Sequence, residues 1–168
     1  MRKETKIRIW GFLFVGVLGV LFHFAYDFLG QSDIAGLFFP VNESIWEHLK
    51  LVLLPVILWW IVVRKPGDGR KRTFASRVWA VSLAMLFLPV AFYTYSGVIG
   101  QRFVAVDISL FFLADFLYFW LESRFLRKEK PESEGENVLA VMVFFLWVFA
   151  FGLFSFFPPE LGIFQVPQ

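Results

Sequence analysis

Residues 138–157 read VLAVMVFFLWVFAFGLFSFF, a run of twenty positions without a charged side chain. Because an α-helix rises about 1.5 Å per residue, about twenty apolar residues are enough to cross the hydrocarbon core of a bilayer. Pro158 and Pro159 follow directly, and proline is poorly tolerated inside a helix. The segment therefore predicts a transmembrane helix that ends at the two prolines.

Four more apolar segments precede this one, and the composition of the whole chain agrees with them. Of the 168 residues, 58% are hydrophobic and 24 are Phe, whereas soluble domains average about 45–50% apolar residues. A soluble fold of this size would leave too much apolar surface in contact with water. We therefore expect an all-α fold, a polytopic bundle of five transmembrane helices forming a single domain over residues 1–168. The expected spans cover residues 9–29, 45–63, 78–99, 103–121 and 138–157.

The positions of the basic residues predict the orientation of the bundle. Fourteen of the sixteen Lys and Arg residues lie in three segments, residues 2–8, 64–77 and 124–130. In a five-span chain these segments share one side of the membrane, and Lys and Arg are enriched in cytoplasmic loops. We expect a multi-pass protein of the cytoplasmic membrane with its N-terminus inside and its C-terminus outside.

Charge and cysteine content exclude several classes of function. The net charge is only +2, and the basic clusters fit the ends of membrane spans, so nucleic acid is not expected as a partner. The chain contains no Cys, which excludes disulfides, thiolate metal sites and cysteine nucleophiles. The expected partners are the lipid bilayer and a lipid or small-molecule ligand, and the sequence leaves a homo-oligomer open.

Ionisable side chains within the predicted spans are few, and several of them fall at one depth. Counted along each helix, His23 lies about 9 Å below the outer surface, and His48 and Asp107 lie about 6 Å below it. Asp27 shares a helix face with His23 and lies one turn nearer the outside. Three different helices thus deliver polar groups to one layer near the outer face.

These side chains are suited to metal binding. Imidazole and carboxylate groups bind zinc, iron or manganese, and a site with fewer protein ligands than coordination positions leaves room for water. A bound metal lowers the pKa of that water, and a nearby carboxylate can act as general base. In this hypothesis one divalent metal ion is bound by His23, Asp27, His48 and Asp107. Glu43 either completes the same shell or, with Glu47, is a catalytic carboxylate.

Structural roles compete with this hypothesis for part of the set. Residues 44–47, SIWE, match a capping box in which Ser44 caps the helix and Glu47 reaches back to its backbone. Lys50 could instead extend outward and pair with Glu43 or Glu47. Asp115 lies near the middle of the fourth span without an obvious basic partner. It is either protonated or hydrogen-bonded to Ser82 or a tyrosine.

Residues 39–50, FPVNESIWEHLK, resemble the signature of a family of small bacterial integral membrane proteins described as a domain of unknown function. The signature, Pro-Val-Asn-Glu-Ser-x-Trp-Glu-His-x-Lys, follows a first helix that contains a His, here His23. It corresponds to Pro40, Val41, Asn42, Glu43, Ser44, Trp46, Glu47, His48 and Lys50. The resemblance implies that this outer segment is the functional region, and it implies no reaction.

Three functions remain open at this point. The first is a membrane-embedded, metal-dependent hydrolase acting on a lipid or an extracytoplasmic substrate. The second is a small transporter or ion- or proton-binding permease, in which Asp115 marks the route inward. The third is a non-catalytic membrane subunit or sensor that docks a partner on the apolar outer loop, residues 30–42. That loop either lies in the membrane interface or folds back into the bundle.

Overall fold

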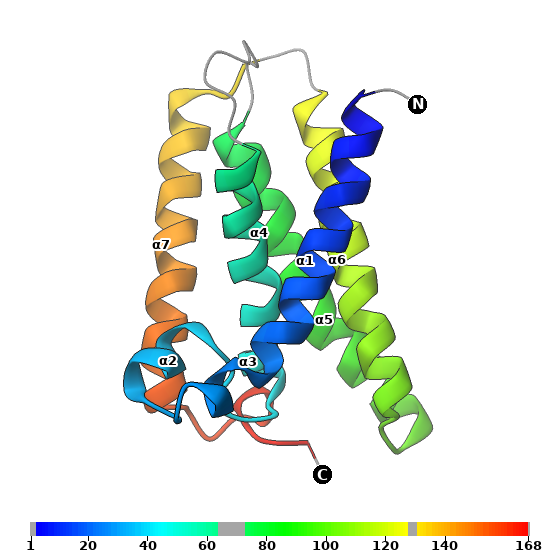
Figure 1. Cartoon of the computed structure of the whole chain (residues 1–168), viewed down its shortest axis with the longest axis vertical. Helices are drawn as coiled ribbons and strands as arrows, with labels where there is room; N and C mark the ends of the chain where they lie inside the picture. Colours follow the sequence, from blue (N-terminus) through cyan, green and yellow to red (C-terminus); the bar gives the residue numbers. More distant parts are fainter. Residues whose placement is uncertain (1–2, 64–72, 128–130, 168) are drawn as a thin grey trace.

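The computed structural model describes residues 3–63, 73–127 and 131–167, and these ranges form an all-α structure (Figure 1). The α-helices are α1 Lys3–Phe28, α2 Asp33–Phe38, α3 Ile45–His48, α4 Lys50–Val62, α5 Phe74–Ile99, α6 Val104–Leu126 and α7 Glu134–Phe156. A short 3₁₀ helix, η1, covers Gly162–Phe164. The first described residues and the C-terminal segment lie at opposite ends of the bundle (Figure 1).

Five helical segments of the described chain are long and apolar enough to cross a membrane: α1, α3 with α4, α5, α6 and α7. This confirms the predicted all-α class with five long apolar helices that could span a membrane. The predicted ends lie within a few residues of the helices, which extend further at the basic end of the bundle. Residues 64–72 and 128–130, which carry many of the charges behind the predicted orientation, lie outside the described residues. The orientation therefore stays a prediction.

The five long helices differ greatly in how much of their surface they bury. In α7 only Ala140 and Phe151 are buried, and many of its large apolar side chains are exposed. Helix α4 is the opposite, because most of its residues lie in the core, with Val52 and Val56 fully buried. An apolar helix with an exposed apolar surface suits a lipid solvent, in which that surface needs no cover.

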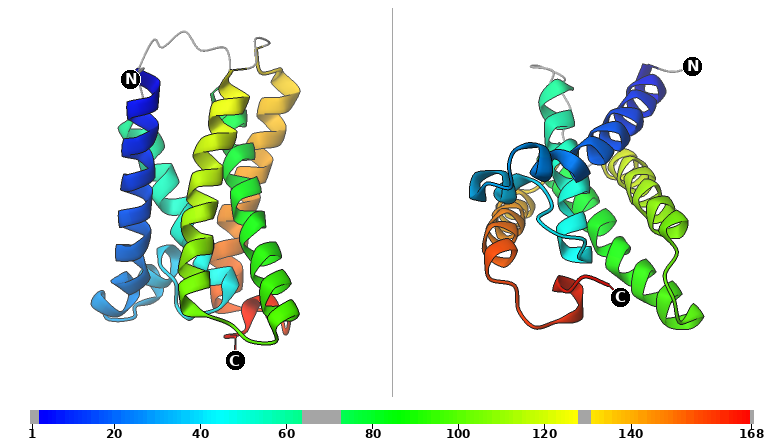
Figure 2. Two further views of the ribbon diagram at one scale, coloured as in Figure 1. Left: turned by 90° about the vertical axis from the view of Figure 1, so that its right-hand side faces the viewer. Right: turned by 60° about the horizontal axis from the view of Figure 1, so that its bottom comes forward.

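Helices α5 and α6 form an antiparallel hairpin, and α1 packs against both α4 and α6 (Figure 2). The side chain of Tyr118 in α6 is completely buried in the centre of the core. Its hydroxyl accepts a hydrogen bond of 2.7 Å from Trp60 Nε1 in α4. One turn further along α6, Glu122 accepts a 3.0 Å hydrogen bond from Arg77 Nε of α5. These bonds fix α6 against α4 and α5.

The outer loop folds over one end of the bundle rather than hanging free. Its short helix α2 begins at Ser32, whose hydroxyl accepts from the backbone of Ala35, and it packs against α7 (Figure 1). Gly36 sits so close to its neighbours that an added Cβ would lie 2.9 Å from Val41 Cγ1. This close packing of α2 holds residues 39–44, the segment that leads into α3, in place.

Candidate metal centre

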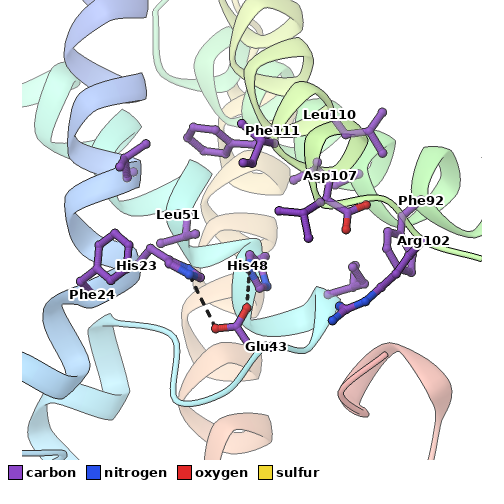
Figure 3. A pocket seen from close by; sticks show the side chains of 16 residues that line it. His23, Phe24, Glu43, His48, Leu51, Phe92, Arg102, Asp107, Leu110 and Phe111 are labelled. Carbon is purple, nitrogen blue, oxygen red and sulfur yellow. Dashed lines mark ion pairs between the residues drawn. The ribbon is translucent and has the colours of Figure 1, made fainter. Parts of the chain in front are cut away.

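Two histidines and one glutamate meet at the end of the bundle where the outer loop enters α3 (Figure 3). His23 comes from α1, His48 ends α3, and Glu43 lies just before α3. Glu43 Oε1 lies 3.6 Å from His23 Nε2, and Glu43 Oε2 lies 3.5 Å from His48 Nε2. One ligand atom from each side chain can be chosen so that all three lie within 4.8 Å of one another. We call these residues the His/Glu triad.

Local hydrogen bonds hold Glu43 in this position. Asn42 Oδ1 accepts a 2.8 Å bond from the backbone N–H of Ser44, which closes a tight turn around Glu43. The Ser44 hydroxyl then accepts from the backbone N–H of Glu47 and caps the start of α3. Glu43 therefore lies within a hydrogen-bonded turn, and its side chain projects between the two imidazoles.

The other ring nitrogen of His48 faces a backbone carbonyl. Its Nδ1 lies 2.8 Å from the oxygen of Ser44. Because a carbonyl oxygen can only accept, we assign the proton to Nδ1, which leaves the lone pair of a neutral imidazole on Nε2. A hydrogen bond of this kind is the usual support behind a metal-ligating histidine. His48 Nε2 is thus free to act as a ligand.

In this tautomer, a cation placed between His48 Nε2 and Glu43 Oε2 would be bound by both atoms. In a tetrahedral zinc site with metal–ligand distances near 2.1 Å, neighbouring N and O ligands are about 3.4 Å apart. The N···O separations of 3.5 and 3.6 Å in the triad are close to that value.

The structure gives Glu47 a structural position and places it away from the triad. Its side chain is buried and accepts hydrogen bonds from the backbone of Val41 at 2.9 Å, Lys50 Nζ at 2.8 Å and Ser155 Oγ at 2.6 Å. The predicted capping box is therefore half correct: Ser44 caps α3, but the Glu47 carboxylate bonds to Val41 instead of reaching back to Ser44. Three of the about four acceptor positions of the Glu47 carboxylate are therefore occupied.

Lys50 is buried, contrary to the expectation that it extends outward. It is 1% exposed, and its ammonium group donates to Glu47, to the carbonyl of Gly36 at 2.7 Å and to that of Phe39 at 3.3 Å. The three protons of the ammonium group thus have three acceptors. The predicted pairing with Glu47 is confirmed. Through its bonds to Gly36 and Phe39, Lys50 also connects the outer loop to the start of α4.

Trp46 is the apolar anchor of the same segment. Its ring packs at centroid distances of 5.0–6.2 Å against Trp147, Phe151 and Phe154 of α7 and Phe164 of η1. Only 8% of Trp46 is exposed. Because α3 is pinned to α7 on this side, its opposite side presents His48 to α1.

The His/Glu triad lines one side of a cavity of about 360 Å³ enclosed by α1, α3, α4, α5 and α6. Arg102 and Asp107 line the other side (Figure 3). The rest of the wall is apolar and consists of Gly19, Val20, Phe24, Ile45, Leu51, Leu88, Phe92, Val104, Ile108, Leu110 and Phe111. The histidine side chains are 29% and 31% exposed and Glu43 is 58% exposed, so water can reach the triad.

The remaining predicted site residues lie apart from the triad. Asp27 accepts a 2.8 Å hydrogen bond from Gln31. Asp107 shares the cavity, but its carboxylate accepts a hydrogen bond from the hydroxyl of Tyr95. Within the described chain neither belongs to a metal-binding group with the two histidines. The structure therefore gives no support for Asp27 as a ligand. Asp107 lies on the side of the cavity opposite the His/Glu triad.

Asp115 is fully buried in α6, and neither of its carboxylate oxygens has a hydrogen-bond partner in the described part of the chain. Of the two alternatives for Asp115, the hydrogen bond to Ser82 or a tyrosine is not present among the described residues, where the Ser82 hydroxyl accepts from Trp147 Nε1 at 3.0 Å. Asp115 is also absent from the residues that line the cavity. It is a separate feature of the core.

Two residues near the site were missed from the sequence. Arg102 lies outside the three basic segments of the sequence, and Ser155 lies within the apolar span of residues 138–157. Arg102 lies in the short connection between α5 and α6, five positions before Asp107, and this spacing was a usable signal. Nothing in the sequence pairs Ser155 with Glu47, since 108 positions separate them.

Fold and site together define an all-α protein with five segments able to cross a membrane and a His/Glu group able to hold a metal. The chain belongs to the Family of unknown function (DUF6512), whose model matches residues 1–167. This confirms the resemblance to a family of unknown function. Neither a curated protein nor a solved structure matches the chain.

Proposed function

We propose that this protein is a membrane-embedded, metal-dependent hydrolase whose metal is held by His23, Glu43 and His48. In the predicted orientation the site opens on the outer side of the cytoplasmic membrane. A substrate would reach it from the outer aqueous phase or from the lipid.

The observation that carries the proposal is the geometry of the His/Glu triad. Two neutral imidazoles and one carboxylate are a donor set found in catalytic zinc sites, which keep a further position for water. Here the three side chains come from separate segments, α1, the turn before α3 and the end of α3, yet their ligand atoms gather around one point. The cavity borders all three, which gives a bound water and a substrate room beside the metal.

The chain's own groups have separable tasks in this proposal. A metal in the triad would lower the pKa of its water and supply a nucleophile at neutral pH. The carbonyl of Ser44 fixes the tautomer and direction of His48. The turn at Asn42 and Ser44 fixes Glu43, and the buried Glu47–Lys50 pair fixes that turn against the bundle.

The permease hypothesis draws less support from the structure. In that hypothesis the same polar groups hold a cation or relay protons and Asp115 marks the route inward, but Asp115 does not line the cavity that contains the triad.

Metal content tests the proposal most directly. The protein is purified in mild detergent without chelator or a histidine tag, and its metals are measured by elemental analysis. We expect about one zinc or manganese per chain in the wild type, a loss of this metal in His48→Ala and His23→Ala, and a marked reduction in Glu43→Gln. Glu160→Gln is the matched control, because Glu160 is an exposed carboxylate near the same end of the bundle.

Two results would count against the proposal. A wild-type protein without metal would remove its basis. Iron as the specific metal would instead favour oxygenase chemistry, which uses the same set of two histidines and one carboxylate.

Hydrolysis is tested separately on chromogenic substrates. Release of p-nitrophenol from its fatty acyl ester and from its phosphate monoester and diester is compared for metal-loaded protein and for protein treated with chelator. We expect turnover of at least one substrate that needs metal and is lost in Glu43→Gln but kept in Glu160→Gln. Turnover that survives both chelation and Glu43→Gln would contradict the assignment.

A further inference from the structure

We propose that the substrate of this site is a single-chain lipid with a phosphate headgroup. The phosphate would lie between the His/Glu triad and Arg102, and the chain would pass between α1 and α6. The inference rests on the proposed metal-dependent function and adds the class of substrate to it.

The polar end of the cavity is suited to an anion. Arg102 extends from the α5–α6 connection toward Glu43 from the far side of the cavity (Figure 3). A metal in the triad and the guanidinium of Arg102 would place positive charge on two sides of one space. Asp107 is the other charged group of that side, and its carboxylate is bonded to Tyr95. Metal ions and Arg together are a common arrangement for binding phosphate, because guanidinium donates two parallel hydrogen bonds to its oxygens.

The apolar wall of the cavity continues onto the outer surface of the bundle. Four of its lining residues are strongly exposed: Val20 at 46%, Phe24 at 52%, Val104 at 66% and Ile108 at 53%. Val20 and Phe24 belong to α1, and Val104 and Ile108 belong to α6. The cavity therefore opens sideways between these helices, on a surface that would face lipid in a membrane. A hydrocarbon chain attached to a bound headgroup can leave through this opening without meeting water.

The size of the cavity favours a substrate with one chain. Its volume of about 360 Å³ is near the lower end of the range of about 300–1,000 Å³ for small-molecule pockets. That space accommodates a headgroup and the first part of one chain. The wall beside α1 is also fixed: a Cβ on Gly19 would lie 2.4 Å from the ring of Phe111 and 2.9 Å from the carbonyl oxygen of Leu51.

The reaction expected for such a substrate is hydrolysis of its phosphate ester. The oxygen of one water forms a bond to phosphorus, and the bond between phosphorus and the ester oxygen of the lipid breaks. The ester oxygen takes up one proton of the water and leaves as a lipid alcohol. The phosphate keeps the oxygen and the other proton of the water. No group is oxidised or reduced.

Binding of dodecyl phosphate tests the inference without requiring turnover. Detergent-solubilised, metal-loaded protein is titrated with dodecyl phosphate, dodecyltrimethylammonium or inorganic phosphate, and binding is measured by native mass spectrometry. We expect specific binding of dodecyl phosphate, weaker binding of inorganic phosphate, and no specific binding of the cationic amphiphile. Metal content is measured on the same preparations.

Two pairs of variants test the two ends of the ligand. Arg102→Gln is expected to weaken dodecyl phosphate binding about tenfold or more, with partial recovery in Arg102→Lys and no change in the control Arg124→Gln. Val104→Trp narrows the side opening and is expected to weaken dodecyl phosphate binding about tenfold while leaving inorganic phosphate binding unchanged. Val98→Trp is its control, because Val98 is 82% exposed and does not line the cavity.

The outcomes separate this inference from the proposed function. If the wild type holds metal but Arg102→Gln and Val104→Trp bind dodecyl phosphate normally, the lipid phosphate assignment is overturned and the metal site stands. Equal binding of dodecyltrimethylammonium would also overturn it. If no metal is retained, the hydrolase proposal fails, and binding that still depends on Arg102 and Val104 would support the lipid phosphate site alone.

Discussion

At the scale of single residues, the sequence could locate the layer of the site but could not select all its members. The direction and rise of the helices predicted His23 and His48 at one depth. In the structure the centroids of their rings are 5.3 Å apart. Glu43 could not be preferred over Asp27 or Asp107, because its direction depends on the hydrogen-bonded turn at Asn42. Glu47 looked equally suitable until its partners Val41 and Ser155 were known.

The buried pair of Glu47 and Lys50 gives a first prediction. Lys50→Met leaves the Glu47 carboxylate buried without its cation, which typically costs about 3–5 kcal/mol. We expect a large loss of stability in denaturant or thermal unfolding in detergent, and a smaller loss in the double variant Lys50→Met/Glu47→Gln than the sum of the single variants. Arg8→Met is the control, since its pair with Glu4 is partly exposed, at 26% and 58%, and such pairs are worth about 1 kcal/mol or less. Equal losses in Lys50→Met and Arg8→Met would contradict the structural role.

Asp115 gives a second prediction at the same scale. It is buried without a hydrogen-bond partner in the described chain, and such a group typically costs about 1–3 kcal/mol. Asp115→Val, which is similar in size and apolar, is therefore expected to raise the unfolding temperature. Asp115→Asn retains a polar group and is expected to give no such gain. A lower unfolding temperature for Asp115→Val would indicate a partner for the carboxylate.

At the scale of elements, hydropathy was enough for the long helices and insufficient for the short ones. Five spans were predicted because each is a continuous apolar run whose length matches a bilayer. The helix α2 and the tight turn at Leu49, where its N–H donates to Trp46, depend on local hydrogen bonds. Their stability comes from packing against α7 and η1, which no local pattern in residues 30–50 encodes.

The anchoring of α3 to α7 gives a third prediction. Trp46→Ala removes the ring that packs against Trp147, Phe151, Phe154 and Phe164, and a truncation of this kind costs about 3–5 kcal/mol. We expect lower stability together with weaker metal retention, because α3 also carries His48. Trp10→Ala, at a ring that is 68% exposed, should change neither property. Full metal retention in a destabilised Trp46→Ala protein would show that the triad does not need this anchor.

At the scale of the whole molecule, the number of long helices was predicted, their packing partners were not, and their predicted direction across a membrane is still to be measured. An odd number of spans puts the two ends of the chain on opposite sides, and the structure has them at opposite ends of the bundle (Figure 1). The side on which each end lies is predicted from the basic residues alone, because a fold has the same contacts in either direction.

The absence of Cys from the chain makes that orientation easy to test. A single cysteine at Gln101, in the connection between α5 and α6, is expected on the outside, and one at Glu134, at the start of α7, on the inside. A membrane-impermeant maleimide applied to intact cells should label Gln101→Cys, and it should label Glu134→Cys only after permeabilisation. The reverse pattern would place the His/Glu triad on the cytoplasmic side.

The hydrogen bond from Ser155 to Glu47 also has a consequence for biosynthesis. These residues are 108 positions apart, and Ser155 lies near the end of the last long helix. During synthesis α1 to α6 enter the membrane before α7 exists, so Glu47 and Lys50 first face the bilayer without this cover. In the proposed metalloprotein, the segment that carries Glu43 and His48 would gain this last support only when α7 docks, so metal loading would be a late event. A chain that ends before residue 134 would leave the Glu47–Lys50 pair without the Ser155 hydroxyl.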